Sequence, residues 1–70
     1  MSYEYVSRNK KDAKESARVL EELVRRGFNP ISVRWKPETN SVVVYFEDTL
    51  DVEAKEKLDK AMKALGYMVT

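Results

Sequence analysis

Five consecutive apolar residues, at positions 42–46, stand in the middle of a 70-residue chain in which 36% of the residues are charged. The run is short and rich in β-branched and aromatic side chains, which is typical of a strand. Successive side chains of a strand point to opposite faces of the sheet. Val42, Val44 and Phe46 therefore share one face, and we expect this face to lie against the core.

The other face of the same strand carries Val43 and Tyr45. The flanking residues of this parity, Ser41 and Glu47, are polar, which indicates a face in contact with water. We therefore predict that Val43 and Tyr45 lie on the side of a sheet that no helix covers. What two apolar side chains do on an open face is the main functional question.

A first helix is predicted before this strand, because apolar residues recur at spacings of three and four over residues 13–24. Arg25 and Arg26 favour the negative end of the helix dipole, and Gly27 can adopt the left-handed conformation that ends many helices. We therefore predict a helix that Asn9 caps and that ends near Arg26. Its apolar positions are Ala13, Ala17, Leu20, Leu23 and Val24.

Further segments have the pattern of strands or of a turn. Residues 3–7 are rich in aromatic and β-branched side chains, and apolar and polar residues alternate over residues 31–36. The sequence Pro-Glu-Thr-Asn at residues 37–40 favours a turn. We therefore predict a first strand over residues 3–7 and a hairpin that joins residues 31–36 to residues 41–47.

A second helix is predicted over residues 54–65, where apolar residues again recur at spacings of three and four. Asp48 and Thr49 can accept hydrogen bonds from free amides at its start, and Gly66 ends it. The remaining residues, 67–70, are predicted to form a short last strand. The apolar positions of this helix are Ala54, Leu58, Ala61, Met62 and Leu65.

The predicted order of elements is strand, helix, strand, strand, helix, strand. Two right-handed crossovers joined by a hairpin give an α+β fold, the ferredoxin-like split βαβ plait, in a single domain of residues 1–70. This fold is a four-stranded antiparallel sheet in the order 4-1-3-2 with both helices on one face. The residues expected in its core are Val33, Trp35, Val44, Phe46, Leu20, Leu23, Val24, Leu58, Met62 and Leu65.

The residue types exclude several classes of activity. The chain contains no Cys and no His, so it has neither a thiol nucleophile nor a His-activated serine. It also lacks the two side chains that bind zinc most often. Thirteen Lys and Arg against twelve Asp and Glu give a net charge of +1, which provides no long-range attraction for nucleic acid or acidic lipid. No window approaches the length of a membrane span. We expect no catalytic residue, no cofactor, no metal and no membrane partner.

Charged residues on both predicted helices form acid-to-base pairs four residues apart. Each such pair stabilises an isolated helix by about 0.2 to 0.5 kcal/mol. We therefore interpret these carboxylates as parts of a solvated, helix-supporting surface instead of general acids or bases. The pairs are Glu21 with Arg25, Glu22 with Arg26, Glu53 with Lys57, Glu56 with Lys60 and Asp59 with Lys63.

Arg8, Lys10 and Lys11 follow the first predicted strand and precede the first predicted helix. Free amides at a helix start favour anions, so these cations are one candidate for contact with a phosphate. The segment has no glycine, so its backbone cannot wrap closely around an anion as a P-loop does. The alternative interpretation is a basic loop that only aids solubility.

Arg34, Val43 and Tyr45 form the second candidate, with either Val6 or Tyr5 joining them from the first strand. Aromatic rings on the open sheet of RNA-recognition motifs stack on single-stranded bases, and the arrangement resembles theirs in architecture but not in sequence signature. Alternatively the face contacts a protein, including a second copy in a homodimer through the sheet. A third interpretation is that these residues serve strand pairing alone.

Residues 31–70 resemble the second half of a heavy-metal-associated domain of the copper-chaperone type. The resemblance rests on the hairpin, on Phe-Glu-Asp at residues 46–48 and on Ala-Leu-Gly-Tyr at residues 64–67. That family holds its metal with a Met-x-Cys-x-x-Cys loop after the first strand. This chain has Ser-Arg-Asn-Lys-Lys at that place, residues 7–11, so the resemblance extends to the fold and not to metal carriage.

Over its whole length the chain resembles computationally designed or redesigned ferredoxin-like proteins. Both glycines lie at predicted helix ends, both prolines lie in predicted loops, and acid-to-base pairs line both helices. The resemblance implies a thermostable, non-enzymatic small scaffold with no evolved biochemical function. The alternative is a small natural binding module for nucleic acid or a protein partner, which uses the open sheet face and the basic loop. We expect a natural protein of this kind in the cytoplasm.

Overall fold

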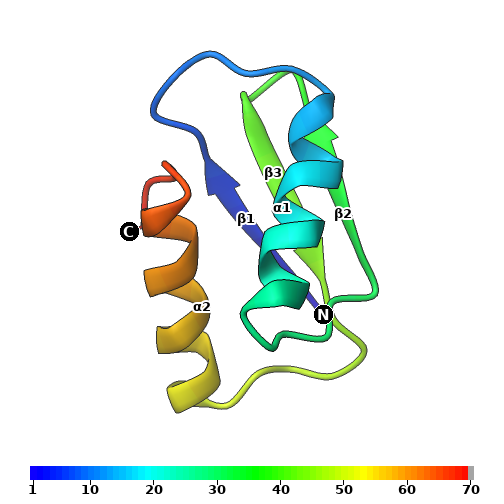
Figure 1. Ribbon diagram of the computed structural model, residues 1–70, viewed down its shortest axis with the longest axis vertical. Helices are drawn as coiled ribbons and strands as arrows, with labels where there is room; N and C mark the ends of the chain where they lie inside the picture. Colours follow the sequence, from blue (N-terminus) through cyan, green and yellow to red (C-terminus); the bar gives the residue numbers. More distant parts are fainter. Residues whose placement is uncertain (70) are drawn as a thin grey trace.

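Two helices and three strands form the part of the chain that the computed structural model describes, residues 1–69 (Figure 1). The α+β class, the antiparallel sheet and both helices are as predicted. The elements are β1 (Ser2–Val6), α1 (Lys14–Arg25), β2 (Ser32–Lys36), β3 (Ser41–Tyr45) and α2 (Val52–Ala64).

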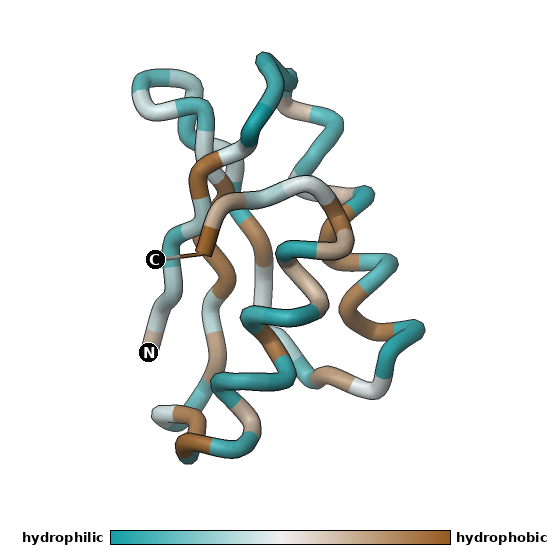
Figure 2. Tube along the Cα trace, turned by 90° about the vertical axis from the view of Figure 1, so that its left-hand side faces the viewer, coloured by the Kyte–Doolittle hydropathy of each residue, from teal (hydrophilic) through white to brown (hydrophobic). Residues whose placement is uncertain are grey.

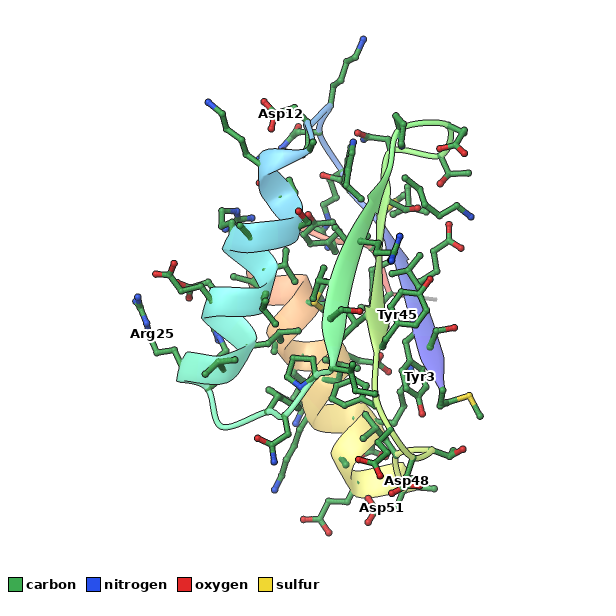
Figure 3. All side chains as sticks on the ribbon, turned by 90° about the vertical axis from the view of Figure 1, so that its right-hand side faces the viewer. Tyr3, Asp12, Arg25, Tyr45, Asp48 and Asp51 are labelled. Atoms are coloured by element: carbon green, nitrogen blue, oxygen red, sulfur yellow. The ribbon has the colours of Figure 1, made fainter. Side chains whose placement is uncertain are left out.

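The apolar run falls in β3, which is the central strand of a sheet with the order β1-β3-β2. β3 pairs antiparallel with both neighbours, and its Val43 lies opposite Glu4 of β1 and Arg34 of β2. Both helices lie on one side of this sheet, and Tyr45 lies on the other side (Figure 3). A strand with neighbours on both edges and helices on one face accounts for the density of apolar residues.

The predicted fourth strand and the sheet order 4-1-3-2 are not shown. Within residues 1–69 the last segment makes one isolated antiparallel bridge, between Tyr67 and Ser7. The N–H of Arg8 donates to the carbonyl oxygen of Gly66 at 3.1 Å, and the N–H of Met68 donates to that of Val6 at 2.8 Å. Residue 70, the end of the predicted strand, lies outside the described residues.

The core lies between the helices and the sheet, where hydrophobic segments of the strands face those of the helices (Figure 2). Of the predicted core residues, Val24 is wrong, because it is 57% exposed. It stands five residues beyond the buried Val19, about 140° around a helix of 3.6 residues per turn. The buried core residues are Tyr5, Val19, Leu23, Val33, Val42, Val44, Phe46, Leu58, Ala61, Met62 and Tyr67, with Tyr3, Leu20, Phe28, Trp35, Leu50 and Leu65 partly buried against them.

The start of α1 differs from the prediction. The residue at the cap position is Ala13, which has no side-chain oxygen, and the predicted cap, Asn9, lies several residues before the helix. A carboxylate oxygen of Asp12 accepts a hydrogen bond from the N–H of Lys14 at 2.9 Å. The helix therefore begins where the apolar pattern indicated but later than the predicted cap, and a loop separates it from β1.

The start of α2 also differs, whereas both helix ends are as predicted. Asp51, not Asp48 or Thr49, caps α2, and its carboxylate accepts a hydrogen bond from the N–H of Ala54 at 2.8 Å. Gly27 and Gly66 follow the two helices with φ angles of +92° and +97°. These angles fall in the left-handed region, which suits glycine at helix ends.

Three of the five predicted acid-to-base pairs are present: Glu21 with Arg25 at 3.3 Å, Glu22 with Arg26 at 3.8 Å and Glu53 with Lys57 at 3.6 Å. The pairing of Asp59 with Lys63 is wrong, because Asp59 contacts Lys55, four residues earlier, at 2.6 Å. No ion pair joins Glu56 to Lys60 among the described residues. The Asp59 carboxylate also accepts a hydrogen bond from the Tyr5 hydroxyl at 2.7 Å.

Candidate functional surfaces

The open face of the sheet presents three rows of side chains that run across the strands. The register places Glu4, Val43 and Arg34 in one row, because Val43 faces Glu4 on one side and Arg34 on the other. Tyr45 lies in the row nearer the start of β1, between two serines. The structure therefore brings three of the predicted contact residues, Arg34, Val43 and Tyr45, onto one surface.

The open face is also polar. The hydroxyl of Ser41 donates to the Glu4 carboxylate at 2.7 Å, and that of Thr39 donates to it at 3.2 Å. The Lys36 ammonium lies 3.5 Å from the same carboxylate. The hydrogen bond from Ser41, together with Lys36 and Thr39, holds the pKa of Glu4 below its ordinary value. Glu4 is therefore a fixed negative charge at one edge of this face.

The prediction that Val43 is exposed to water is wrong. It lies on the open face, yet it is only 7% exposed and does not belong to the core cluster. Its position in the central strand, flanked by the longer side chains of Glu4 and Arg34, explains this burial. Val43 therefore supports strand pairing and offers little surface to a ligand.

Tyr45 is half-buried and lines a shallow hollow of about 600 Å³ at the end of the open face. Arg34 also lines the hollow, as do Met1 and Ile31, which are 57% and 64% exposed. An aromatic ring, an exposed cation and two exposed apolar side chains thus meet at one place. The sequence reasoning missed Met1 and Ile31, which lie outside the regular strands.

The basic loop lies at the other end of the sheet. Arg8, Lys10 and Lys11 follow the end of β1, next to the turn between β2 and β3, whereas Tyr45 pairs with the first residue of β1. The side chain of Asn40 holds the loop: its oxygen accepts from the N–H of Lys11 at 3.0 Å, and its nitrogen donates to a loop carbonyl at 2.9 Å. The two predicted contact groups therefore do not form one site.

The helix face contains a buried polar cluster that the sequence did not reveal. The Tyr67 hydroxyl donates to the Glu15 carboxylate at 2.5 Å, and Arg18 donates to the same carboxylate at 2.9 and 3.1 Å. Burial raises the pKa of Glu15, but the hydrogen bonds from Arg18 and Tyr67 outweigh it, so the pKa lies below its ordinary value. Burial and the bond to Glu15 raise the pKa of Tyr67. The cluster therefore joins an anionic Glu15 to a neutral Tyr67.

A second cluster links β1 to α2. The Tyr5 hydroxyl donates to the Asp59 carboxylate at 2.7 Å, and burial followed by this bond raises the pKa of Tyr5. The Lys55 ammonium, paired with Asp59, lies 5.5 Å from the ring centre of Tyr3 and 5.6 Å from that of Tyr5. A cation at this distance from an aromatic ring is attracted to its face. The cluster is satisfied internally and fixes α2 against β1.

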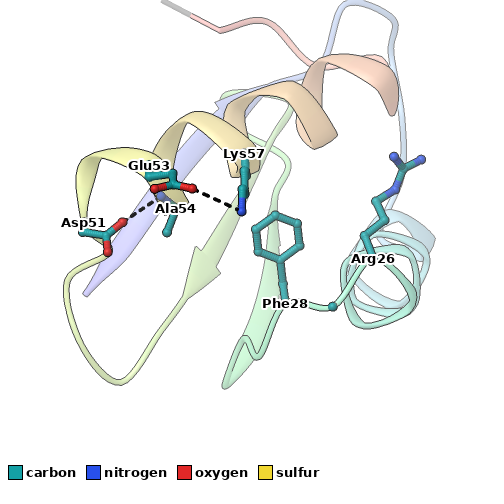
Figure 4. Close-up of a pocket in the computed structure, with 7 residues that line it drawn as sticks. Arg26, Phe28, Asp51, Glu53, Ala54 and Lys57 are labelled. Atoms are coloured by element: carbon teal, nitrogen blue, oxygen red, sulfur yellow. Dashed lines mark hydrogen bonds and ion pairs between the residues drawn. The ribbon is translucent and has the colours of Figure 1, made fainter.

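A cleft of about 460 Å³ lies between the end of α1 and the start of α2 (Figure 4). Phe28 lines it together with Arg26 and Lys57, and Asp51 and Glu53 add acidic groups. The charges are already matched, because Glu53 pairs with Lys57 and Asp51 caps α2. The cleft therefore presents no excess charge to a ligand.

Two classes of site are not found in the described part of the chain. No group of three or more carboxylates, His or Cys that could hold a metal ion occurs within residues 1–69. Over the same residues, neither helix is long and apolar enough to cross a membrane. Comparison with known proteins finds no matching family model and no significant match to a curated protein or a solved structure.

Proposed function

We propose that this protein is a non-catalytic small scaffold, of a designed or idealised kind, with no evolved ligand. The observation that carries the proposal is that every buried side-chain nitrogen or oxygen in residues 1–69 has a hydrogen-bond partner within the fold. The carboxylate of Glu15 and the hydroxyls of Tyr5 and Tyr67 are committed to structural pairs. A catalytic base or nucleophile must face a substrate, and these groups face partners within the fold instead.

We also propose the ferredoxin-like arrangement, with residues 67–70 in the fourth position beside β1. The bridge between Ser7 and Tyr67 supports it, since its direction is antiparallel and it lies on the edge of β1 that β3 does not use. Slower amide exchange at Val6 and Glu4 than at other edge positions in the free protein would support this pairing.

The second candidate is a binding module that uses the hollow around Tyr45. Single-stranded nucleic acid is bound by aromatic rings that stack on bases and by cations that contact phosphates. Tyr45 and Arg34 supply one of each, and the exposed Met1 and Ile31 add apolar area. The half-burial of the Tyr45 ring and the Glu47 carboxylate, which also lines the hollow, make this candidate weaker than the scaffold.

Titration with a fluorescently labelled single-stranded oligonucleotide at low and moderate salt separates the two candidates. The scaffold proposal expects no change in anisotropy at either salt concentration. Binding that weakens steeply with salt and is lost in Tyr45→Ala and in Arg34→Ala would contradict it and establish the module. Val24→Ala, which alters an exposed apolar residue of α1, is the control.

The variant Arg8→Ala/Lys10→Ala tests the basic loop in the same titration. If binding is lost in this variant and kept in Tyr45→Ala, the loop and not the open face holds the nucleic acid. Loss of binding in both Arg8→Ala/Lys10→Ala and Tyr45→Ala would show that the oligonucleotide runs along the whole length of the sheet, because the two sets of residues lie at its opposite ends.

A further inference from the structure

A hollow of about 330 Å³, which we call the Phe28 hollow, lies between the end of α1 and the middle of α2. It borders the cleft of Figure 4 and shares Arg26, Phe28 and Lys57 with it. Lys60 and Ala61 complete the Phe28 hollow in place of the acidic residues of the cleft. Among residues 1–69, no carboxylate lines the Phe28 hollow. Three cations and one aromatic ring therefore meet there without a negative side chain.

The end of α1 fixes the position of Phe28. Gly27 follows the helix in the left-handed conformation, with a φ of +92°. The N–H of Phe28 then donates to the carbonyl oxygen of Leu23 at 2.9 Å, and the N–H of Gly27 donates to that of Val24 at 3.0 Å. These two bonds form a Schellman motif, which holds the residue after the glycine close to the helix. The Phe28 side chain is partly buried against the core and lines the hollow with the rest of its surface.

α2 supplies the opposite wall of the Phe28 hollow. Lys57, Lys60 and Ala61 are spaced by three and four residues, so they lie on one face of the helix with their β-carbons about 5 to 6 Å apart. Ala61 is buried and has only a methyl group, so the space beside the two lysines stays open. The two ammonium groups can therefore reach one ligand from the same helix.

The three cations are available to a ligand. The Lys60 ammonium makes no ion pair within residues 1–69, although the sequence predicts an acid-to-base pair there. Arg26 lies 3.8 Å from a carboxylate oxygen of Glu22, and Lys57 lies 3.6 Å from one of Glu53. Both distances are longer than an N–H···O hydrogen bond, and the Arg26 and Lys57 side chains are 41% and 69% exposed. Exposed pairs of this kind contribute little, so both cations can turn toward an anion.

The residues of the Phe28 hollow match the two halves of an aromatic phosphate. A phosphate monoester carries between one and two negative charges near neutral pH and has three strong acceptor oxygens, which suits several cations at once. Aromatic rings attract each other in offset or edge-to-face arrangements, which suits Phe28. The volume is at the lower end of the range for small-molecule sites. A small ligand with one ring and one phosphate therefore fits both the charge and the size.

We propose that the Phe28 hollow binds small aromatic phosphates, with the ring of the ligand against Phe28 and its phosphate beside Lys57, Lys60 and Arg26. The proposal goes beyond the scaffold function, because folding alone does not require such a site. The Phe28 hollow is also separate from the hollow around Tyr45, which lies on the side of the sheet that the helices do not cover (Figure 3).

The test uses the full chain, isotope-labelled for NMR, and naphthyl phosphate as the probe. Naphthol is the same ring without the phosphate, and inorganic phosphate is the anion without the ring. Amide chemical shifts are followed at low salt up to about 5 mM probe, since a ligand of this size has a Kd of about 1 mM at ordinary ligand efficiency. We expect naphthyl phosphate to shift the amides of Phe28, Lys57 and Lys60 and to bind at least about fivefold more tightly than either fragment.

Two variants separate the contact with the phosphate from the contact with the ring. Lys60→Gln is expected to weaken naphthyl phosphate about two- to fivefold, the range for one exposed charge pair. Phe28→Leu keeps an apolar side chain against the core and is expected to weaken it about two- to tenfold, the range for an aromatic pair. Lys14→Gln removes the same charge at the far end of α1 and is expected to bind as the parent does. If Phe28→Leu does not fold, the comparison with inorganic phosphate tests the ring contact by itself.

The proposal fails on any of four results. The first is the absence of shifts around Phe28 at the highest probe concentration. The second is a fragment that binds as tightly as naphthyl phosphate, which would show that the ring or the phosphate makes no contact. The third is equal weakening in Lys60→Gln and Lys14→Gln, which would show attraction by the overall charge and not by a site. The fourth is a set of shifts that is largest at Arg34 and Tyr45, which would assign the ligand to the open face and leave the second candidate function in place.

Discussion

Tyr67 shows how single residues hold this fold together. Its fully buried side chain comes from the last segment, and its hydroxyl reaches Glu15 of α1, 52 residues earlier in the chain. Arg18 extends the cluster to the carbonyl of Leu65 at the end of α2. A buried hydrogen bond to an ionised group is stronger than one between neutral groups. The cluster therefore fastens the final segment of the chain to both helices.

Tyr67→Phe removes the hydroxyl and leaves the buried Glu15 carboxylate with one partner fewer. We expect the free energy of unfolding in urea to fall by about 1 to 3 kcal/mol, the range for a group deprived of a buried hydrogen bond. Tyr45→Phe is the matched control, because Tyr45 is half-buried on the open face, and we expect less than about 0.5 kcal/mol there. Equal losses in the two variants would contradict a special role for the Glu15 contact.

Glu15 also makes stability depend on pH. Its pKa lies lower in the folded chain than in the unfolded chain, so the unfolded chain binds more protons in the acidic range. The stabilisation is present above the unfolded pKa of about 4.3 and is lost as the pH falls through the folded pKa. Urea unfolding measured below neutral pH is therefore expected to show a steep loss of stability that is shallower in Glu15→Gln. Glu38→Gln, in the exposed turn, is the control and should lose stability with falling pH as the parent does. If Glu15→Gln also follows the parent, Glu15 is not the source of the pH dependence.

These residue-scale contacts could not be predicted from the sequence. Periodicity indicates which face of an element is apolar, but it does not identify a partner many positions away. Glu15 reads as an ordinary charge at the start of a helix, and Tyr67 reads as one apolar residue of a short strand. For the same reason, the sequence alone does not decide on which face of the sheet Tyr5 lies. Only the register with β3 places it toward α2.

At the scale of elements, the sequence predicts the ends of the helices better than their starts. Gly27 and Gly66 end them because few other residues adopt a positive φ at low cost. Several side chains with an oxygen acceptor precede α2, and the sequence gives each of them the same capacity to cap the helix. Only the path of the chain after β3 selects Asp51 (Figure 3).

Asp51→Ala tests this choice of cap. The variant loses the acceptor for the N–H of Ala54, and we expect the free energy of unfolding to fall by about 0.5 to 2 kcal/mol. Asp48→Ala removes the residue that the sequence favoured, and we expect a change of less than about 0.5 kcal/mol. Chemical denaturation followed by circular dichroism measures both. A larger loss in Asp48→Ala would show that the helix begins earlier in solution.

The apolar face of α1 gives a further lesson about elements. Leu20 and Leu23 lie against the core as predicted, but Val24 is exposed, and the contact face includes Val19, which the predicted stripe left out. A helix with apolar residues over a wide arc has no unique orientation until a sheet is placed beneath it. The prediction of which face of the sheet is open is correct, because successive side chains of β3 alternate strictly between two faces and only one of them can lie against the helices. The burial of Val43 depends on its neighbours across the strands and could not be predicted.

At the scale of the whole molecule, one core of buried side chains connects both helices to all three strands. Trp35 on β2, the single Trp of the chain, reports this core by fluorescence under selective excitation, whereas circular dichroism reports α1 and α2. Because one core serves every element, we expect the two signals to coincide in a single urea transition, with a slope of about 1 kcal/mol per molar, at the low end for small domains. The midpoint should not depend on protein concentration, because the face of the sheet that would join two copies is polar around Glu4 and Lys36. A midpoint that rises with concentration would show a homodimer stabilised by mass action. A fluorescence transition that precedes the helical one would instead show that the hairpin opens before the helices, and the molecule would then contain two cooperative units.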